Sequence, residues 1–157
     1  MEFTQIETPI GIIMIQGDEN GISSISISEE TIENTSEIHS SLIQAQKQIL
    51  EYFANQRTEF TFKINPKGTE FQQKVWNELQ NIPFGTTTSY LGLSKNLDNV
   101  KAIRAVASAN SKNPLLIVVP CHRVIGKDGS LTGFSAGLWR KQWLLEHENP
   151  SKQRSLF

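Results

Sequence analysis

Apolar and polar residues alternate along the first 30 residues of the chain, MEFTQIETPIGIIMIQGDENGISSISISEE. The alternation is interrupted at residues 9–11 and again at residues 18–21, where Pro, Gly, Asp and Asn gather. A period of two residues broken by such residues is typical of antiparallel strands joined by tight turns. We therefore expect a small sheet of three antiparallel strands.

The next stretch, residues 40–56, has helical spacing, with apolar residues at Leu42, Ile43, Ile49, Leu50 and Phe53. This spacing predicts a helix that covers one face of the sheet. Residues 60–64 are predicted to form one further strand. The sequence NPKG at residues 65–68 is predicted to be the linker between two lobes.

Beyond the linker the pattern predicts helices. Residues 69–82 carry a stripe of Phe71, Val75, Trp76 and Leu79, with Thr69 as the N-cap. Shorter helices are predicted over residues 88–95 and 100–110, with a polar turn between them. Two short helices joined by a tight turn resemble a helix-turn-helix, although antiparallel helix pairs in any helical lobe give the same pattern.

Charge is distributed unevenly along the 157 residues, although the net charge is only −1. Lys and Arg number five against twelve Asp and Glu in residues 1–80, and ten against four in residues 81–157. The basic half predicts an anionic partner, with nucleic acid as the leading candidate and a solvated charged face as the alternative.

The cysteine content and the hydropathy of the chain indicate in which cellular compartment the protein works. The single cysteine cannot form an internal disulfide, and the first residues lack a basic segment followed by an apolar one. No apolar run approaches the roughly 20 residues needed to cross a bilayer. We expect a cytoplasmic protein that does not bind membranes.

That cysteine, Cys121, lies in the stretch NPLLIVVPCHRVIG. The apolar residues 115–119 are predicted to be buried and extended. A thiol with an ordinary pKa near 8.5 is only about 3% ionised at pH 7, so a nucleophile needs a cation or a base beside it. His122 and Arg123 follow, but successive side chains of an extended segment point to opposite sides, so His122 would act through water or from a tight turn. A buried inert cysteine is the alternative.

The region NPLLIVVPCHRVIGKDGSLTGFSAGLWRKQWLLEHE resembles the active-site region of the O6-alkylguanine-DNA alkyltransferases, and the likeness covers about residues 68–148. It implies an α+β fold, in which a small N-terminal antiparallel sheet with a helix (RNase H-like) precedes a mostly helical C-terminal lobe with a winged helix-turn-helix. Residues 1–67 would form a scaffold lobe and residues 68–148 an alkyltransferase and DNA-binding lobe. We expect residues 149–157 to be a flexible tail.

The resemblance implies repair of O6-alkylguanine, and of O4-alkylthymine, by one irreversible transfer of the alkyl group to Cys121 after base flipping. His122 would take the thiol proton through water, Glu148 would orient His122, and Asn113 would brace the turn. The implied partner is double-stranded DNA with an alkylated guanine, bound through the minor groove by a monomer. No cofactor is implied, and no metal site is expected because residues 1–67 hold only His39 among the Cys and His that bind zinc.

Further contacts follow from the resemblance. Arg104 would replace the flipped guanine in the base stack, and Tyr90 would contact the flipped base; their alternatives are a phosphate contact and a core aromatic. The Val124 carbonyl and the Ser135 amide, on a hairpin at residues 124–134 and just after it, would bind the guanine amino group and O6. The remaining expected DNA contacts are Ser89, Ala105 and Ser111.

A last helix is predicted over residues 138–146, with Trp139 or Trp143 and Leu144 beneath the site. Two other functions compete with repair. One is a non-catalytic lesion-binding relative, against which the presence of Cys121 argues. The other is an unrelated Cys-His hydrolase or transferase that turns over many substrates.

Overall fold

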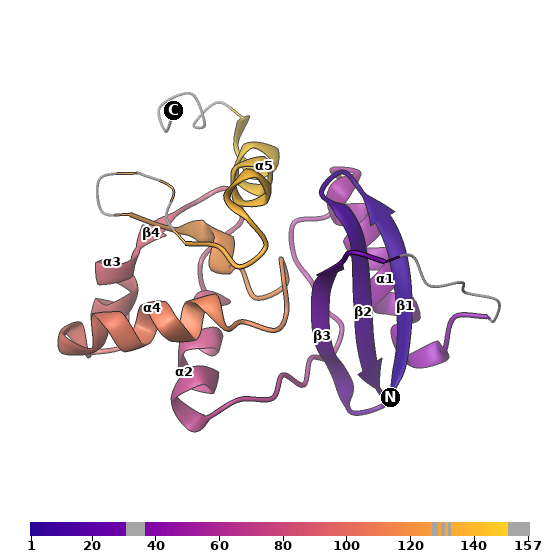
Figure 1. Cartoon of the computed structure of the whole chain (residues 1–157), viewed down its shortest axis with the longest axis horizontal. Coiled ribbons are helices and arrows are strands. Elements are labelled where there is room, and N and C mark those ends of the chain that lie inside the picture. The colour runs from indigo at the N-terminus through magenta and orange to yellow at the C-terminus, as the bar shows by residue number, and fades with distance from the viewer. Residues whose placement is uncertain (31–36, 127–128, 130, 132, 151–157) are drawn as a thin grey trace. The chain divides into compact units, whose positions relative to one another are not determined.

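The computed structural model of the chain describes residues 1–30, 37–126, 129, 131 and 133–150 (Figure 1). Backbone contacts divide the chain into two compact units. The first comprises Met1–Lys67 with Pro114–Leu116, and the second comprises Gly68–Asn113 with the chain from Ile117 onward.

The first unit contains an antiparallel sheet with strand order β1-β2-β3, formed by β1 (Glu2–Thr8), β2 (Gly11–Asp18) and β3 (Gly21–Ser28) (Figure 1). Ile13 and Ile15 of β2 are fully buried, whereas Met14 between them is half-buried. This alternation places one face of the sheet on the core. The three predicted strands and their two turns are confirmed.

One helix packs on this sheet, namely α1 (Ile43–Phe53), which follows the 3-10 turn η1 (Ser40–Leu42). The Thr4 hydroxyl of β1 donates to the Gln46 side-chain oxygen of α1 at 3.0 Å. The predicted stripe of this helix is partly wrong, because Ile43 and Leu50 are 48% and 42% exposed. The buried side chains of the helix are Ala45, Gln48, Ile49 and Tyr52.

Gln48 explains why the buried face of α1 differs from the predicted one. It also explains why residues 60–64 do not form a strand. The Gln48 amide donates to the Thr61 hydroxyl at 2.8 Å, and its oxygen accepts from the Thr61 backbone N–H at 2.8 Å. The backbone of residue 61 is thus satisfied by a side chain rather than by a neighbouring strand. Only an isolated bridge joins Ile64 to Ile22, so the predicted strand is wrong.

The second unit is mostly helical, as predicted. Its helices are α2 (Glu70–Leu79), α3 (Tyr90–Asn96), α4 (Ile103–Ser111) and α5 (Leu138–Glu148). The 3-10 turns η2 (Val100–Ala102) and η3 (Cys121–Arg123) precede α4 and β5, and the short strands β4 (Thr88–Ser89) and β5 (Val124–Ile125) pair in parallel.

The start of α2 follows its predicted N-cap. The Thr69 hydroxyl accepts from the Gln72 backbone N–H while the Gln72 side chain accepts from the Thr69 N–H, which forms a capping box. The indole N–H of buried Trp76 donates to the Ala109 carbonyl at 2.9 Å and so links α2 to α4. A Cβ atom at Gly68 would lie 2.4 Å from the Trp76 ring, so the close approach requires glycine there.

The apolar residues 115–119 are buried as predicted, except for half-buried Val118, but they are not extended throughout. Ile117 has a φ of 73°, in the left-handed region that a β-branched residue rarely adopts, and the chain turns there. Within the first unit, the Ile25 N–H donates to the Pro114 carbonyl and the Leu116 N–H donates to the Ile25 carbonyl. These two bonds form an isolated parallel β-bridge between Ile25 and Leu115, so only the turn at Ile117 ends the extended course of the segment.

Two expectations lie wholly or partly outside the described residues. The predicted hairpin includes residues 127, 128, 130 and 132, and the expected tail includes residues 151–157. Within the described ranges, no helix combines the length and apolar character needed to span a bilayer.

Candidate active site

Cys121 sits directly after a tight turn centred on Pro120. Pro120 has φ −81° and ψ 63°, and the Cys121 N–H donates to the Val119 carbonyl at 2.8 Å, which is the geometry of an inverse γ-turn. Cys121 then begins the 3-10 turn η3. Because successive residues of a 3-10 turn lie about 120° apart, His122 need not point away from Cys121 as it would in an extended segment. The tight turn considered from the sequence is present.

Asn113 braces this turn. Its side-chain N–H donates to the Val119 carbonyl at 2.6 Å, and the same side chain hydrogen-bonds the Cys121 sulfur. One amide group thus contacts both the residue before Pro120 and the thiol after it. The structure brings these two predicted site residues together.

His122 and Glu148 form a buried pair, with 2.7 Å between Nε2 and Oε2. An ionised carboxylate can only accept hydrogen bonds, so a neutral His122 carries its proton on Nε2 and leaves the lone pair on Nδ1. Nδ1 is buried and has no hydrogen-bond partner among the described residues. The imidazole is therefore oriented to accept a proton at Nδ1.

Arg123 binds the same carboxylate. Its Nε donates to Glu148 Oε1 at 2.8 Å, its Nη2 donates to Oε2 at 2.9 Å, and its Nη1 donates to the Ile82 carbonyl at 2.7 Å. The guanidinium also lies 5.8 Å from the centroid of the Phe84 ring. The sequence left open whether Arg123 lowers the thiol pKa or pairs with an acid of the other lobe. Its acidic partner, Glu148, belongs to the same unit.

Burial and charge set the protonation states. Burial raises the pKa of the Cys121 thiol, against the opposing effects of the Asn113 hydrogen bond and the Lys141 charge. Burial also lowers the pKa of His122 despite the neighbouring Glu148. Burial alone would raise the pKa of Glu148, but His122 and Arg123 hold it well below its usual range. The resting site thus contains a thiol, a neutral imidazole and a carboxylate.

Lys141 is a neighbour of the site that the sequence analysis missed. It lies on α5 and its side chain is 0% exposed. Burial lowers its pKa to about 8, while the interaction with Cys121 acts in the opposite direction. Its sequence position carried a signal, because residues 141, 144, 145 and 148 fall on one helical stripe and a lysine interrupts the apolar part of it.

The residues expected to contact DNA lie on and before α4, the second helix of the helix-turn-helix. Arg104, Ala105 and Ser111 are exposed, and so is Ser108, which the sequence analysis did not name. The opposite side of α4 buries Val106, Ala109 and Asn110. The structure therefore gives α4 an outward face on which Arg104 and Ile103 are the large side chains and the others are small.

Ser89 lies at the start of α3 and acts as its N-cap, since its hydroxyl accepts from the Gly92 N–H at 2.9 Å. A Cβ atom at Gly92 would lie 2.6 Å from the Thr88 hydroxyl oxygen. This cap fixes the direction in which α3 leaves β4.

The three expected substrate contacts, Tyr90, Val124 and Ser135, all lie in the second unit. Half-buried Tyr90 begins α3, and a Cβ atom at Gly133 would lie 3.9 Å from its hydroxyl. Buried Val124 donates its backbone N–H to the Cys121 carbonyl, while exposed Ser135 lies in a turn.

The two tryptophans of the last helix differ in burial. Trp139 is 53% exposed and therefore does not lie beneath the site. Trp143 is half-buried and its ring stacks on that of His147 with 4.9 Å between centroids, whereas Leu144 is fully buried.

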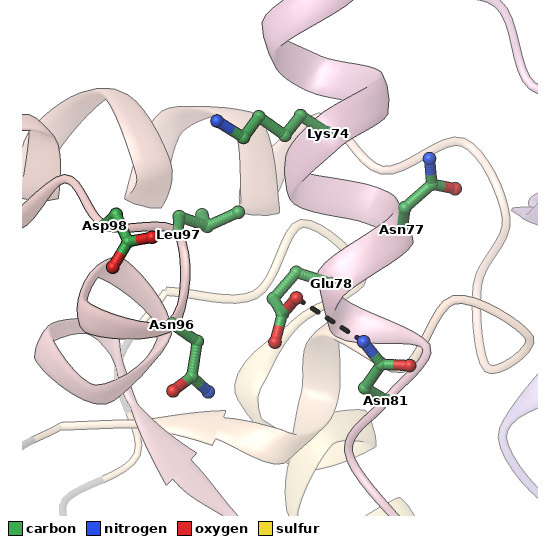
Figure 2. Close-up of a pocket in the computed structure, with 7 residues that line it drawn as sticks. All are labelled: Lys74, Asn77, Glu78, Asn81, Asn96, Leu97 and Asp98. Carbon is green, nitrogen blue, oxygen red and sulfur yellow. Dashed lines mark hydrogen bonds between the residues drawn. The ribbon is translucent and has the colours of Figure 1, made fainter.

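A cavity of about 290 Å³ lies elsewhere in the second unit, between α2 and the end of α3 (Figure 2). Its lining residues are Lys74, Asn77, Glu78, Asn81, Asn96, Leu97 and Asp98. Neither Cys121 nor His122 lines it, so it is separate from the cysteine site. The described part of the chain contains no group of three or more side chains able to hold a metal ion.

Comparisons with known proteins match both parts of the chain. A family model described as 6-O-methylguanine DNA methyltransferase, ribonuclease-like domain, matches residues 1–66, and one described as its DNA binding domain matches residues 70–150. The methylated-DNA–protein-cysteine methyltransferase of Methanosarcina acetivorans is 42% identical over 153 residues, which cover 94% of this chain and 98% of the relative. The constitutive enzyme of that name from Bacillus subtilis is 42% identical over 141 residues, covering 85% and 86%.

Solved structures agree with these matches. The crystal structure of Mycobacterium tuberculosis OGT in complex with DNA has a TM-score of 0.86 and 37% identity, covering 100% of this chain and 99% of that one. Fold and site thus define a DNA-binding protein with one buried cysteine beside an oriented histidine. The chain belongs to the O6-methylguanine DNA methyltransferase family. The resemblance drawn from the sequence around Cys121 is confirmed.

The buried network predicts how stability depends on pH. The pKa of Glu148 is lower in the folded protein than in the unfolded chain, so the unfolded chain takes up the proton first as the pH falls below about 4.3. The stability contributed by Glu148 is therefore complete above that pH and is lost below it. The lowered pKa of His122 acts in the same direction from about pH 6.5 downward. We expect Glu148→Gln to lower the free energy of unfolding at pH 7 by about 3–5 kcal/mol, because Arg123 stays buried without its anion. The variant should also show a weaker pH dependence below pH 4.3.

Urea unfolding between pH 3 and 8 measures both effects. Glu51→Gln is the control, since Glu51 pairs with Arg57 at 3.1 Å where both side chains are 27% exposed. That pair should contribute less than about 1 kcal/mol. A Glu148→Gln variant as stable as the control variant would contradict the network's role.

Proposed function

We propose that this chain repairs O6-alkylguanine in DNA by a single, irreversible transfer of the alkyl group to Cys121. The observation that carries the proposal is the buried thiol in a braced turn, with a neutral His122 whose other nitrogen is fixed by Glu148. The relatives that are 42% identical are named for methyl transfer from methylated DNA to a protein cysteine. The same attack on O4-alkylthymine belongs to the proposal, because there too an alkyl carbon is bonded to an oxygen on the ring.

In the proposed reaction, the Cys121 thiol gives its proton through a water molecule to His122 Nδ1. The thiolate attacks the alkyl carbon, the bond from that carbon to O6 breaks, and its electron pair stays on the guanine, which then takes a proton. A thioether remains on Cys121. Because a thioether has no easy leaving path in water, each chain reacts once.

Donors placed at O6 favour this step, since negative charge develops there. We propose the Ser135 amide as the donor to O6 and the Val124 carbonyl as the acceptor from the guanine amino group. Tyr90 would contact the base from α3, which is supported by the proximity of its hydroxyl to Gly133.

The reacting base must leave the duplex, at a cost of a few kcal/mol. We propose that Arg104 fills the place of the flipped guanine and that α4 lies in the minor groove. Apart from Ile103, the exposed side chains of α4 beside Arg104 are small, namely Ala105, Ser108 and Ser111, which lets a helix backbone come close to DNA. Ser89 would contact the phosphate backbone from the start of α3.

All groups of the proposed reaction belong to one chain, which supports action as a monomer. Cys121, His122 and Glu148 lie in the second unit, which supports the assignment of residues 68–148 to transfer and DNA binding and of residues 1–67 to a scaffold. A free thiol that must stay reduced supports a cytoplasmic location. The proposed chemistry needs no cofactor.

Stoichiometry separates this function from a Cys-His hydrolase. With an excess of a duplex that contains O6-methylguanine, we expect each chain to gain one methyl group, located on Cys121. Intact-protein mass spectrometry followed by peptide mapping measures this, with an unmodified duplex and Cys121→Ala as controls. Several repaired bases per chain, or repaired DNA beside an unmodified Cys121, would rule the proposal out. Failure of the protein to repair the duplex while still binding it would favour a non-catalytic lesion binder.

The role of Arg104 is tested by comparing two substrates. We expect Arg104→Ala to slow transfer from duplex DNA by about tenfold or more, because the gap in the stack stays unfilled. Reaction with free O6-benzylguanine, which needs no flipping, should change by less than about twofold. Lys101→Ala removes a nearby exposed cation from η2 and serves as the matched control, since its loss should be offset by lowering the salt concentration. Equal losses on both substrates would contradict the flipping role.

A further inference from the structure

We propose that the exposed side chains of Val100 and Ile103 form an apolar ridge that opens the minor groove beside the extruded base and so makes base flipping easier. The inference rests on the proposed function and deepens it, since it names positioning residues for the step that brings the guanine to Cys121. It follows from the exposure of these two side chains and from the cations beside them.

The fold leaves both side chains of the apolar ridge in solvent. Val100 is 49% exposed and Ile103 is 36% exposed. Val100 begins η2, and Ile103 begins α4 three residues later. Side chains three residues apart in a 3-10 turn lie one above the other, so the two form one continuous surface. Single exposed apolar residues are ordinary on proteins, whereas two that adjoin on one element mark a surface for a partner to cover.

A row of cations runs beside the apolar ridge. Lys101 and Arg104 are exposed, lie three residues apart, and each directly follows one residue of the ridge. Successive residues of a helix point about 100–120° apart, so the cations occupy the adjoining side of the same turn. Asp98, the one acidic residue of segment 96–104, instead lines the cavity between α2 and the end of α3 (Figure 2). An apolar ridge with a cationic flank complements the minor groove, where phosphates border the edges of the bases.

The apolar ridge adjoins the residue proposed to replace the flipped base. Ile103 directly precedes Arg104 on α4. Consecutive Cα atoms lie about 3.8 Å apart and successive base pairs about 3.4 Å apart, so with Arg104 in the gap Ile103 meets the neighbouring base step. Proteins that bind the minor groove kink DNA by pressing Ile, Leu or similar side chains against a base step and partly unstacking it. Ile103 opens the groove in this way, and Val100 supports it from one turn earlier.

The fluorescence of 2-aminopurine measures this unstacking without alkyl transfer. The duplex carries 2-aminopurine next to O6-methylguanine, and each protein compared carries Cys121→Ala so that no methyl group moves. We expect Ile103→Ala to reduce the rise in fluorescence at saturating protein by about half or more, because the neighbouring step stays stacked. Ile103→Leu keeps the apolar volume and should retain most of the rise. Ile43→Ala removes a 48% exposed isoleucine from α1 of the first unit and serves as the matched control.

The rate of methyl transfer gives a second readout, measured with Cys121 in place. Ile103→Ala should slow transfer from the duplex about fivefold or more and change the reaction with free O6-benzylguanine by less than about twofold. The loss should be larger when the lesion lies in a stiff A-tract than when it follows a thymine, since a TG step opens easily. Should Ile103→Ala not fold, Val100→Ala is measured in its place.

Three results would overturn the role of the apolar ridge. One is an Ile103→Ala variant that matches the parent in fluorescence and in duplex rate. The second is faster transfer by this variant, which would mean that the bulk of Ile103 only holds α4 away from DNA. The third is an equal loss on free O6-benzylguanine, which would assign Ile103 to the substrate pocket. A parent protein that accepts no methyl group from DNA would instead overturn the proposed function, while the fluorescence still reports on the ridge.

Discussion

The carboxylate of Glu148 accepts hydrogen bonds from both residues that follow Cys121. Because His122 and Arg123 share this one buried group, the end of α5 is joined to the reactive turn at two neighbouring positions. The same region is hydrogen-bonded to the loop after α2. Arg123 donates to the Ile82 carbonyl, and the Asn149 side chain donates to the Gly85 carbonyl at 3.0 Å. Gly85 has a φ of 80°, and a Cβ atom there would lie 3.2 Å from the Glu148 carbonyl oxygen, so glycine lets the loop pass close to the helix end.

This shared carboxylate also has a chemical consequence. An ionised Glu148 fixes the proton of neutral His122 on Nε2 and leaves Nδ1 as the accepting atom. Arg123 compensates the negative charge, so the carboxylate stays ionised in a buried place and does not itself take the proton. In the proposed reaction, the stability of the turn and the direction of proton transfer therefore both depend on the hydrogen bonds of Glu148 to His122 and Arg123. Asn113 acts at the sulfur, to which its side chain hydrogen-bonds.

Much of this could be predicted from the sequence where local physics decides the outcome. Alternation predicted the three strands, the capping residue Thr69 predicted the start of α2, and the motif around Cys121 predicted the family. The missed features depend on contacts between distant residues. Gln48 binds Thr61, which changes the buried face of α1 and replaces a predicted strand. Arg123 pairs with Glu148, an acid 25 residues away in the sequence.

The central claim is that His122 is the base which activates Cys121. The most direct test is the single-turnover rate of methyl transfer from duplex DNA, measured as a function of pH for the parent and for His122→Gln. If His122 is the base, the parent rate should depend little on pH above the lowered pKa of His122. The variant should be slow at pH 7 and speed up steadily with rising pH, as the thiol ionises without a base. A variant that matches the parent rate at pH 7 would contradict the account.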